Sequence, residues 1–582
     1  MPRISKSFHL LSCAASLLLI LNACSTPSPT SPGTAYPQAS GSPSAFPSSQ
    51  PTTAPTPAAT GTPADLPSQA PSLQPSPSPS AETAPPEILD LRANFFQNYG
   101  VNPFVEAATD PLSTFATDVD TAAYTIARGY LNRNQLPPAA SVRTEEYLNY
   151  FNYHYPQPLS GKFAIYTDLA PAYFGDADNR LLRVGIQGRE ILDRNRKNAV
   201  LTLVIDVSGS MNRDNRLSLV KQSLKLLLDN LRPSDRVGLV VYGTDARVLL
   251  PHTSVSNKAL ILSAIDNLRP EGSTNAEAGL SLGYAEASKA FVDQAINRVI
   301  LCSDGVANVG ETGPEQILAR IQTETAKGIS LTALGFGMGD YNDSLMEQLA
   351  NQGDGNYAYI DTLDEARKVL DEQVTSTLQL LAKDAKIQVA FNPELVEQYR
   401  LLGYENRDIA DEDFRNDAVD AGEIGSNHSV TALYELRFKP EATSGTVATV
   451  NFRYQDVDAA NRVVELSHAV SSSDLISFSN ASGSLRLATA VAEFAEILRE
   501  SVFAQGGNLN EVLNLAQTAQ AAYSDDLRIQ EFVGLVQQAA ALKQPSAVLS
   551  ADALLEKSKN PARLPAWESY LLKQLGGQRT QP

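Results

Sequence analysis

The chain is poor in cysteine, histidine and positive charge. Its 582 residues include three cysteines and five histidines, and 46 Lys and Arg stand against 65 Asp and Glu, a net charge of −19. Three cysteines offer no disulfide framework, and Cys302, inside an apolar run, is expected in the core. The histidines show neither an H-E-x-x-H motif nor a paired spacing, which argues against a zinc enzyme. The acidic balance argues against nucleic acid as a partner, because nucleic-acid binders need a basic face.

Long hydrophobic runs are also missing. Beyond residues 1–23, no segment approaches the roughly 18 consecutive apolar residues of a membrane span. Residues 1–23 begin with Arg3 and Lys6 and continue into a short apolar run, as signal peptides do. The run ends in Leu-Asn-Ala followed by Cys24, which resembles a bacterial lipobox with an unusual Asn22. That resemblance implies a lipoprotein signal peptide and a diacylglycerol on Cys24.

The lipid would be the membrane attachment of a cell-envelope protein. No aspartate follows Cys24, so the resemblance implies outer-membrane delivery if the source is Gram-negative. A plain secretory leader is the alternative. Residues 24–86 are almost entirely Pro, Ser, Thr, Ala, Gly and Gln, a composition that cannot bury a core and predicts disorder. Such a linker spans about 45 to 190 Å, enough to hold a folded part away from a membrane.

Residues 196–380 alternate between apolar strand-like runs and amphipathic helical segments. Alternation of this kind predicts an α/β fold with a doubly wound, mostly parallel sheet. The run 199–205 has the length and apolar character of a fully buried strand, and Asp206-Val207-Ser208-Gly209-Ser210 follows it directly. Open α/β sheets place their ligand crevices at the carboxyl ends of such strands.

Two further loops supply oxygen ligands of the same kind. Thr274 precedes a predicted helix, and Asp304 ends a second buried strand. With Asp206, Ser208 and Ser210, this makes five hard oxygen donors from three loops, which suit Mg²⁺, Mn²⁺ or Ca²⁺ better than zinc. The alternative is that these residues only cap helices, which explains one residue per loop.

The D-x-S-x-S loop, the later Thr and the strand-end Asp together resemble the metal-ion-dependent adhesion site of von Willebrand factor type A domains. The resemblance implies a divalent cation, Mg²⁺ first, with Mn²⁺ or Ca²⁺ as alternatives. It also implies that Ser208, Ser210 and Thr274 coordinate directly and that Asp206 and Asp304 act largely through waters. One coordination position would then stay open for an acidic side chain of a partner protein.

The regions on either side are 87–195, 381–470 and 471–582. The first two contain strand-like alternation, 381–470 is β-rich, and 471–582 is predicted helical. They resemble the flanking domains of bacterial lipoproteins that carry one von Willebrand type A domain. The acidic residues between 408 and 423 are predicted to form a solvated face, with calcium binding as the alternative.

These patterns favour a lipid-anchored binding protein rather than an enzyme. A metal-assisted hydrolase is the first alternative, since a bound metal can activate water, but the motif loops contain no histidine that would serve as a base. An envelope-structural protein with a vestigial metal site is the second. The loop from Gly335 to Gly339 spells G-x-G-x-G rather than a dinucleotide motif and is expected to border the metal.

Overall fold

The structure, a computed structural model, describes residues 94–543 apart from residues 118, 306–313, 340 and 442–443. The predicted signal peptide, Cys24 and the predicted linker lie outside the described residues, as do residues 544–582 of the predicted helical region. No helix in the described ranges combines the length and apolar character that a membrane span requires.

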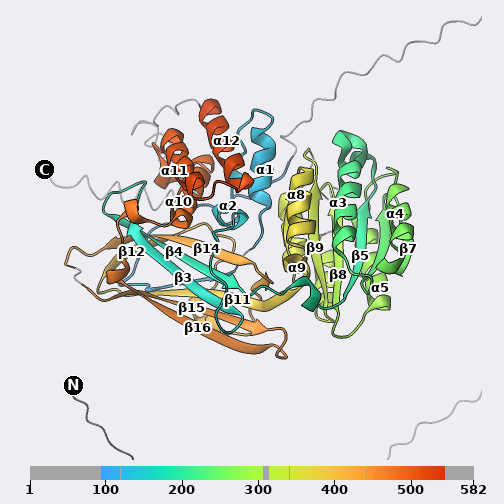
Figure 1. Cartoon of the computed structure of the whole chain (residues 1–582), viewed down its shortest axis with the longest axis horizontal. Coiled ribbons are helices and arrows are strands. Elements are labelled where there is room, and N and C mark those ends of the chain that lie inside the picture. Colours follow the sequence, from blue (N-terminus) through green and yellow to red (C-terminus); the bar gives the residue numbers. More distant parts are fainter. Residues whose placement is uncertain (1–93, 118, 306–313, 340, 442–443, 544–582) are drawn as a thin grey trace, which may run out of the picture. The chain divides into compact units, whose positions relative to one another are not determined.

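Residues 196–380, called the central domain below, contain a six-stranded sheet of order β10-β9-β8-β5-β6-β7 (Figure 1). Neighbouring strands run parallel except β6 and β7, which are antiparallel. The predicted doubly wound, mostly parallel α/β fold is confirmed. Strand β7 escaped prediction because its internal proline reads as a strand breaker. The strands are β5 (Ala199–Asp206), β6 (Arg236–Tyr242), β7 (Ala246–Ser254), β8 (Ile296–Ser303), β9 (Ile329–Phe336) and β10 (Tyr357–Ile360).

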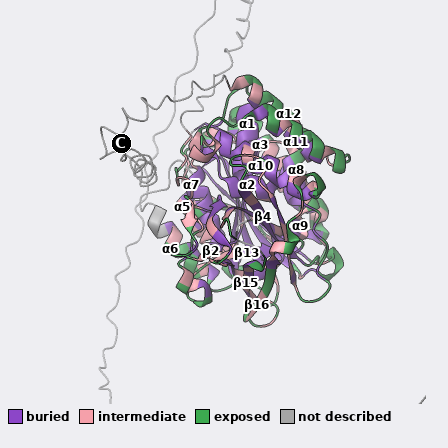
Figure 2. Ribbon diagram, turned by 90° about the vertical axis from the view of Figure 1, so that its left-hand side faces the viewer, coloured by how far each residue is buried: buried purple, intermediate pink, exposed green. Residues whose placement is uncertain are grey.

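Helices cover both faces of this sheet, and each face has its own hydrophobic core. Side chains alternate along β5, so Leu203 and Ile205 pack in one core and Val204 in the other. Cys302 lies fully buried in the first core, as expected. In Figure 2, buried residues fill the interior of the fold and exposed residues gather on the outer helices and loops. The first face carries α3 (Arg216–Asn230), α4 (Lys258–Asp266), α8 (Leu363–Arg367) and α9 (Val374–Leu378), and the second α5 (Ala276–Ala290), α6 (Pro314–Thr325) and α7 (Asp343–Asn351).

The last helix of the central domain is broken, although the pattern predicts one helix over 363–380. A π-helical turn at Lys368–Glu372 separates α8 from α9. The buried Lys368 ammonium donates to the Tyr150 carbonyl at 3.0 Å and lies over the Tyr150 ring. The break therefore occurs where the helix sends a charged side chain into the flanking region, which an amphipathic pattern does not record.

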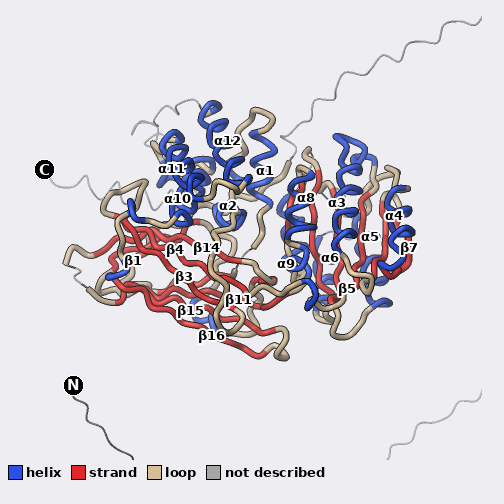
Figure 3. Tube along the Cα trace, in the orientation of Figure 1, coloured by secondary structure: helices blue, strands red, loops and turns tan. Residues whose placement is uncertain are grey.

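The flanking regions build a β-sandwich together (Figure 3). One sheet has the order β1-β12-β14-β4-β3, and the other has the order β13-β11-β15-β16 with β2 paired to β11. β4, which precedes the central domain, pairs with β14, which follows it, over nine residues. The strands are β1 (Val105–Glu106), β2 (Leu112–Ala116), β3 (Phe163–Pro171), β4 (Asn179–Gly188), β11 (Leu380–Phe391), β12 (Val396–Leu402), β13 (Gly422–Gly425), β14 (Ser429–Phe438), β15 (Thr446–Asp456) and β16 (Arg462–Ser471).

Helices from the two ends of the described chain share a further core. Phe151, after α2, contacts Phe532 of α12, and Tyr147 of α2 contacts Phe494 of α10. The predicted helical character after residue 471 is found up to residue 542. The helices are α1 (Ala122–Leu131), α2 (Thr144–Tyr150), α10 (Gly483–Leu498), α11 (Leu509–Ala522) and α12 (Leu527–Leu542).

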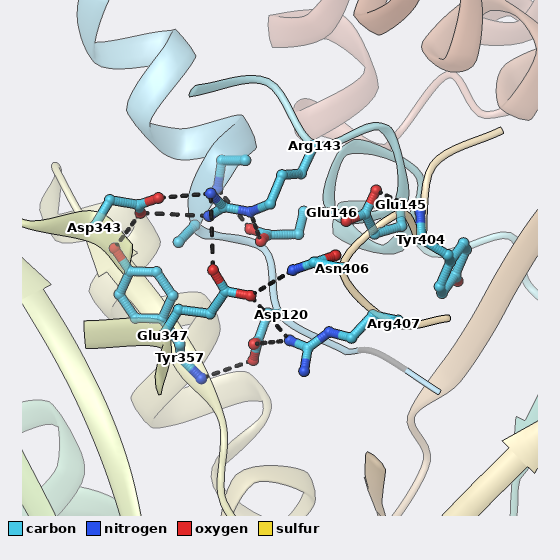
Figure 4. A network of polar contacts seen from close by, with 12 residues as sticks. Asp120, Arg143, Glu145, Glu146, Asp343, Glu347, Tyr357, Tyr404, Asn406 and Arg407 are labelled. Carbon is cyan, nitrogen blue, oxygen red and sulfur yellow. Dashed lines mark hydrogen bonds and ion pairs between the residues drawn. The ribbon is translucent and has the colours of Figure 1, made fainter. Parts of the chain in front are cut away.

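A buried ion network joins the flanking region to the central domain (Figure 4). Arg143 donates to Asp343 of α7 at 2.6 Å and pairs with Glu146 of α2. Arg407 pairs with Asp120 at 3.2 Å and with Glu347 of α7 at 3.3 Å. Each of these four acids thus meets an arginine in the interior.

Candidate metal site

Strand β5 delivers Asp206 to the carboxyl edge of the central sheet. Every residue of β5 is buried, and the Asp206 side chain is 0% exposed at the end of the strand. Its carboxylate accepts hydrogen bonds from the Ser208 backbone N–H at 2.8 Å and from the Ser303 hydroxyl at 3.0 Å. Both carboxylate oxygens are therefore held in place, one by the motif loop and the other by the end of β8.

The two serines of the motif converge above this carboxylate. The Ser208 and Ser210 hydroxyl oxygens lie 3.0 Å apart, with Ser208 buried and Ser210 half-buried. Ser208 occupies the N-cap position of the following 3-10 turn, but its side chain makes no capping hydrogen bond. Helix capping therefore does not account for the Ser208 side chain.

The loop that carries Thr274 is hydrogen-bonded to the D-x-S-x-S loop. The Gly209 N–H donates to the Gly272 carbonyl at 3.1 Å, and the Glu271 N–H donates to the Val207 carbonyl at 2.5 Å. Thr274 is half-buried in this loop, and the next residue, Asn275, caps α5 by accepting from the Ala278 N–H. The cap is therefore Asn275, which leaves the Thr274 hydroxyl for another role.

Asp304 follows β8 and forms an ion pair with Arg216, the first residue of α3. The Arg216 Nη1 atom lies 2.5 Å from Asp304 Oδ2, and Nη2 donates to the Met338 carbonyl. Gly337 makes room for this arginine, since a Cβ at that position would lie 2.2 Å from Arg216 Nε. Residues 337–339 thus border the site through Arg216, in line with the expected rim loop.

Negative charge is concentrated at this edge. Burial, and after it the charge of Asp304, raises the pKa of Asp206 to about 6, although hydrogen bonds from Ser208 oppose the shift. Asp206 and Asp304 therefore repel one another across a site in which Arg216 forms an ion pair with Asp304 alone. A cation placed between the two carboxylates would relieve that repulsion.

Comparison with known families agrees with the fold of the central domain. The profile described as "von Willebrand factor type A domain" matches residues 201–372. The chain contains a von Willebrand factor type A domain. Two further profiles match on either side of it: "von Willebrand factor" over residues 91–183, and "Uncharacterized protein YfbK, C-terminal" over residues 376–542. The central domain is called the type A domain from here on.

Individual relatives cover different shares of the chain. "Uncharacterized protein YfbK" of Escherichia coli is 42% identical over 357 residues, which are 60% of this chain and 62% of that protein. "Inter-alpha-trypsin inhibitor heavy chain H3" of mouse is 28% identical over 177 residues, 29% of this chain and 19% of that protein. This chain therefore spans less than two thirds of either relative.

A solved structure described as "von Willebrand factor type A from Catenulispora acidiphila" aligns with a TM-score of 0.42 and 16% sequence identity. The alignment covers 66% of this chain and 91% of that one.

The residues at the edge of the type A domain suit a divalent cation. All five predicted ligands offer oxygen, the donor that Mg²⁺ and Ca²⁺ prefer. The raised pKa of Asp206 marks negative charge that the surrounding groups do not neutralise. The donor set therefore fits Mg²⁺, and its role as ligand stays a prediction.

Two residues of the site escaped the sequence analysis. Ser303 was read only as the end of a strand, yet its hydroxyl donates to Asp206. Arg216 was not singled out at all, because nothing in its neighbourhood signals a partner 88 residues away in the chain. The signal that could have found it is an arginine buried at the start of a helix directly after the motif loop.

Proposed function

We propose that this chain binds a protein partner through a divalent cation held at the carboxyl edge of its type A domain. The observation that carries the proposal is the convergence of Asp206, the two motif serines, the Thr274 loop and Asp304 at that edge. When bound, Mg²⁺ would supply an electrophilic position that an acidic side chain of the partner can occupy. Mn²⁺ or Ca²⁺ would serve the same role.

The chain's own residues would divide the work. Ser208, Ser210 and Thr274 would hold the cation through hydroxyl oxygens. These ligands are neutral, so they would not cancel the positive charge of the cation. Asp206 and Asp304 would balance part of that charge through waters. The hydrogen bond from Ser303 keeps the Asp206 carboxylate oriented. Arg216 forms an ion pair with Asp304 and adds a positive charge next to the site.

The proposal includes a place in the cell. We infer that Cys24 carries a diacylglycerol and that residues 24–86 tether the folded part to a cell-envelope membrane, the outer membrane in a Gram-negative source. The support is the lipobox-like sequence before Cys24 and the linker composition. Replacing Cys24 with Ala should release the protein from the membrane fraction, and retention of the variant would contradict the anchor.

Metal binding is the first test. Isothermal titration of Mg²⁺ and Mn²⁺ into the full chain should give binding that Asp206→Ala weakens by more than about tenfold. The matched control is Asp229→Ala, which removes an exposed aspartate on the same helix as Arg216. Equal binding by the parent and the Asp206 variant would refute the site.

Partner chemistry is the second test. Immobilised peptides with a central Glu should capture the full chain in Mg²⁺ and release it in EDTA. The same peptides with Gln in place of Glu should not capture it. Capture that ignores EDTA, or that ignores the exchange of Glu for Gln, would contradict recognition of a carboxylate through the metal.

No catalytic step forms part of the proposal. A metal-assisted hydrolase would need a general base within reach of the metal. Phosphoester and peptide substrates with Mg²⁺ should therefore give no turnover that depends on Asp206. Such turnover would replace the binding function with a hydrolytic one.

A further inference from the structure

A second group of carboxylates lies away from the edge described above. Asp354, Asp420 and Glu423 each place one carboxylate oxygen within 4.8 Å of the others. Asp354 precedes β10 of the type A domain, whereas Glu423 lies on β13 of the sandwich. Because residues before a parallel strand lie at the amino edge of the sheet, this cluster is opposite to the Asp206 edge.

The loop that carries Asp354 is fixed tightly to the sheet. The Leu331 N–H of β9 donates to the Gly353 carbonyl at 2.7 Å. A Cβ on Gly355 would lie 1.7 Å from the Leu331 carbonyl oxygen, so only glycine allows this approach. Asp354 itself has φ +45° and pairs with Lys383, which lies in an irregular stretch of β11. The position of Asp354 is therefore set by its neighbours.

Glu423 is buried without a direct hydrogen-bond or ion-pair partner among the described residues. Its side chain is 7% exposed, and no group in the described part of the chain donates a hydrogen bond to it or forms an ion pair with it. This corrects the prediction of a solvated face for residues 408–423, which fits the exposed Glu412 but not Glu423. The acidic composition does not reveal that Glu423 lies on β13, which pairs with β11 in the sandwich.

Carboxylates outnumber cations around this point. Asp384 adds a further negative charge close to Asp420. Lys383 forms an ion pair with Asp354 of the cluster. The buried Arg298 nearby donates to the Thr332 hydroxyl at 2.7 Å instead. Burial, and then the charges of Asp354 and Asp420, raise the pKa of Glu423 well above its usual range. Burial and Asp354 likewise raise the pKa of Asp420 to about 6.

We propose that Asp354, Asp420 and Glu423 form a Ca²⁺ site. Oxygens on opposite sides of Ca²⁺ are about 4.6 to 5.2 Å apart, so carboxylate oxygens within 4.8 Å of one another fit around it. Asp420 and Glu423 also line a cavity of about 170 Å³. That cavity has room for the waters that would complete a shell of six to eight oxygens.

Calcium at this point would connect two parts of the fold. Asp354 belongs to the type A domain, Asp420 precedes β13 of the sandwich, and Glu423 lies on β13. The ion would neutralise the buried Glu423 carboxylate and hold the Asp354 loop against the sandwich. This role is structural and does not depend on the cation at the Asp206 edge.

The experiment must separate the two sites. Full-length chain carrying Asp206→Ala, which disables the first site, is titrated with Ca²⁺ and with Mg²⁺. We expect one Ca²⁺ per chain with a dissociation constant of about 0.1 to 1 mM. Adding Glu423→Gln, or separately Asp420→Asn at the surface, should weaken it more than about tenfold. Glu412→Gln, a nearby exposed acid, should leave it unchanged.

Three outcomes would overturn the proposal: no Ca²⁺ binding, Ca²⁺ binding that both variants retain, or Mg²⁺ binding as tight as Ca²⁺. Thermal unfolding adds a second measurement, the change in Tm on adding Ca²⁺. A glutamate with only a structural role would not affect this change. Ca²⁺ should raise the Tm of the parent but not that of Glu423→Gln. In EDTA the Gln variant should melt no lower than the parent, because it removes an unpaired buried charge. A lower Tm in EDTA would mean that Glu423 stabilises the fold without calcium.

Discussion

Two regions of this molecule bury carboxylates, and they treat them differently. In the network between α2 and α7, Arg143 and Arg407 meet Asp343, Glu146, Asp120 and Glu347 directly. At the carboxyl edge of the type A domain, Arg216 pairs with Asp304, whereas the described residues give Asp206 hydrogen bonds from Ser208 and Ser303 but no ion pair. Buried acids that are matched by arginines hold a fold together. Buried acids left unmatched either take up a proton or leave room for an external cation.

Helix α10 shows the same contrast within one turn. Glu496 pairs with Arg400 at 3.0 Å and Arg499 at 3.4 Å, and although burial opposes it, these arginines lower the pKa of Glu496. For Glu493, burial and the neighbouring Glu496 raise the pKa to about 8. The described residues give Glu493 no hydrogen bond or ion pair. Two glutamates three residues apart therefore differ because one has arginine partners.

Breaking the matched network should have the largest effect. Arg143→Met removes the partner of Asp343 and Glu146 and leaves buried charge uncompensated. We expect it to lower the free energy of unfolding by about 3–5 kcal/mol, measured by denaturant titration of the full chain. Arg415→Met is the control, because its pair with Glu465 is exposed and should contribute about 0–1 kcal/mol. Equal effects of the two changes would show that the network does not hold the domains.

The unmatched Glu493 should give the next largest effect, with a defined pH dependence. Its pKa is about 8 in the folded protein against an ordinary value of 4.5, so the folded state holds a proton that the unfolded state has lost between these values. Stability therefore falls as the pH rises from 4.5 to 8.

Glu493→Gln keeps the group neutral and should stabilise the protein by roughly 2–4 kcal/mol at pH 8, with no gain below pH 4.5. Denaturant titrations across this range measure the difference, with Glu412→Gln as the exposed control. A gain that does not change with pH would argue against the protonated glutamate.

The smallest expected effect is that of Arg216 on the affinity of the predicted site for Mg²⁺. Arg216 places a positive charge on Asp304 and would repel a bound cation. Arg216→Met should strengthen Mg²⁺ binding by about 1 kcal/mol, roughly fivefold, in isothermal titration. Arg320→Met, which removes an exposed arginine on α6, should not change it. Weaker binding in Arg216→Met would instead mean that the arginine is needed to orient Asp304.

The site was more predictable from sequence than its surroundings. Asp206, Ser208 and Ser210 are contiguous, and Asp304 ends an apolar run, so strand-end logic places them at one edge of the sheet. Thr274 was found differently, from its place directly before a predicted helix, which is α5 in the structure. The pairing of Arg216 with Asp304 was not predictable, because the Arg216 side chain fits only where Gly337 has no side chain. A contact of this kind depends on tertiary packing and leaves no pattern in the sequence.

Long-range pairing set the limit of prediction elsewhere. The alternation in residues 163–188 indicates strands, but nothing in it names β14 as the partner of β4. The acidic composition of residues 408–423 indicates a solvated face, but Glu423 is buried on β13, which pairs with β11. In both cases the deciding neighbour lies far away in the sequence.

The pairing of β4 with β14 also dictates an order of folding. All strands of the type A domain lie between residues 199 and 360, so this domain is complete before β14 is synthesised. Strands β3 and β4 pair with each other, but the other edge of β4 must wait for β14, which follows about 240 residues later, on the order of ten to fifty seconds at usual synthesis rates. Until then β4 has an unpaired edge, the kind of strand that aggregates readily. The sandwich therefore closes last, around a type A domain that has already formed.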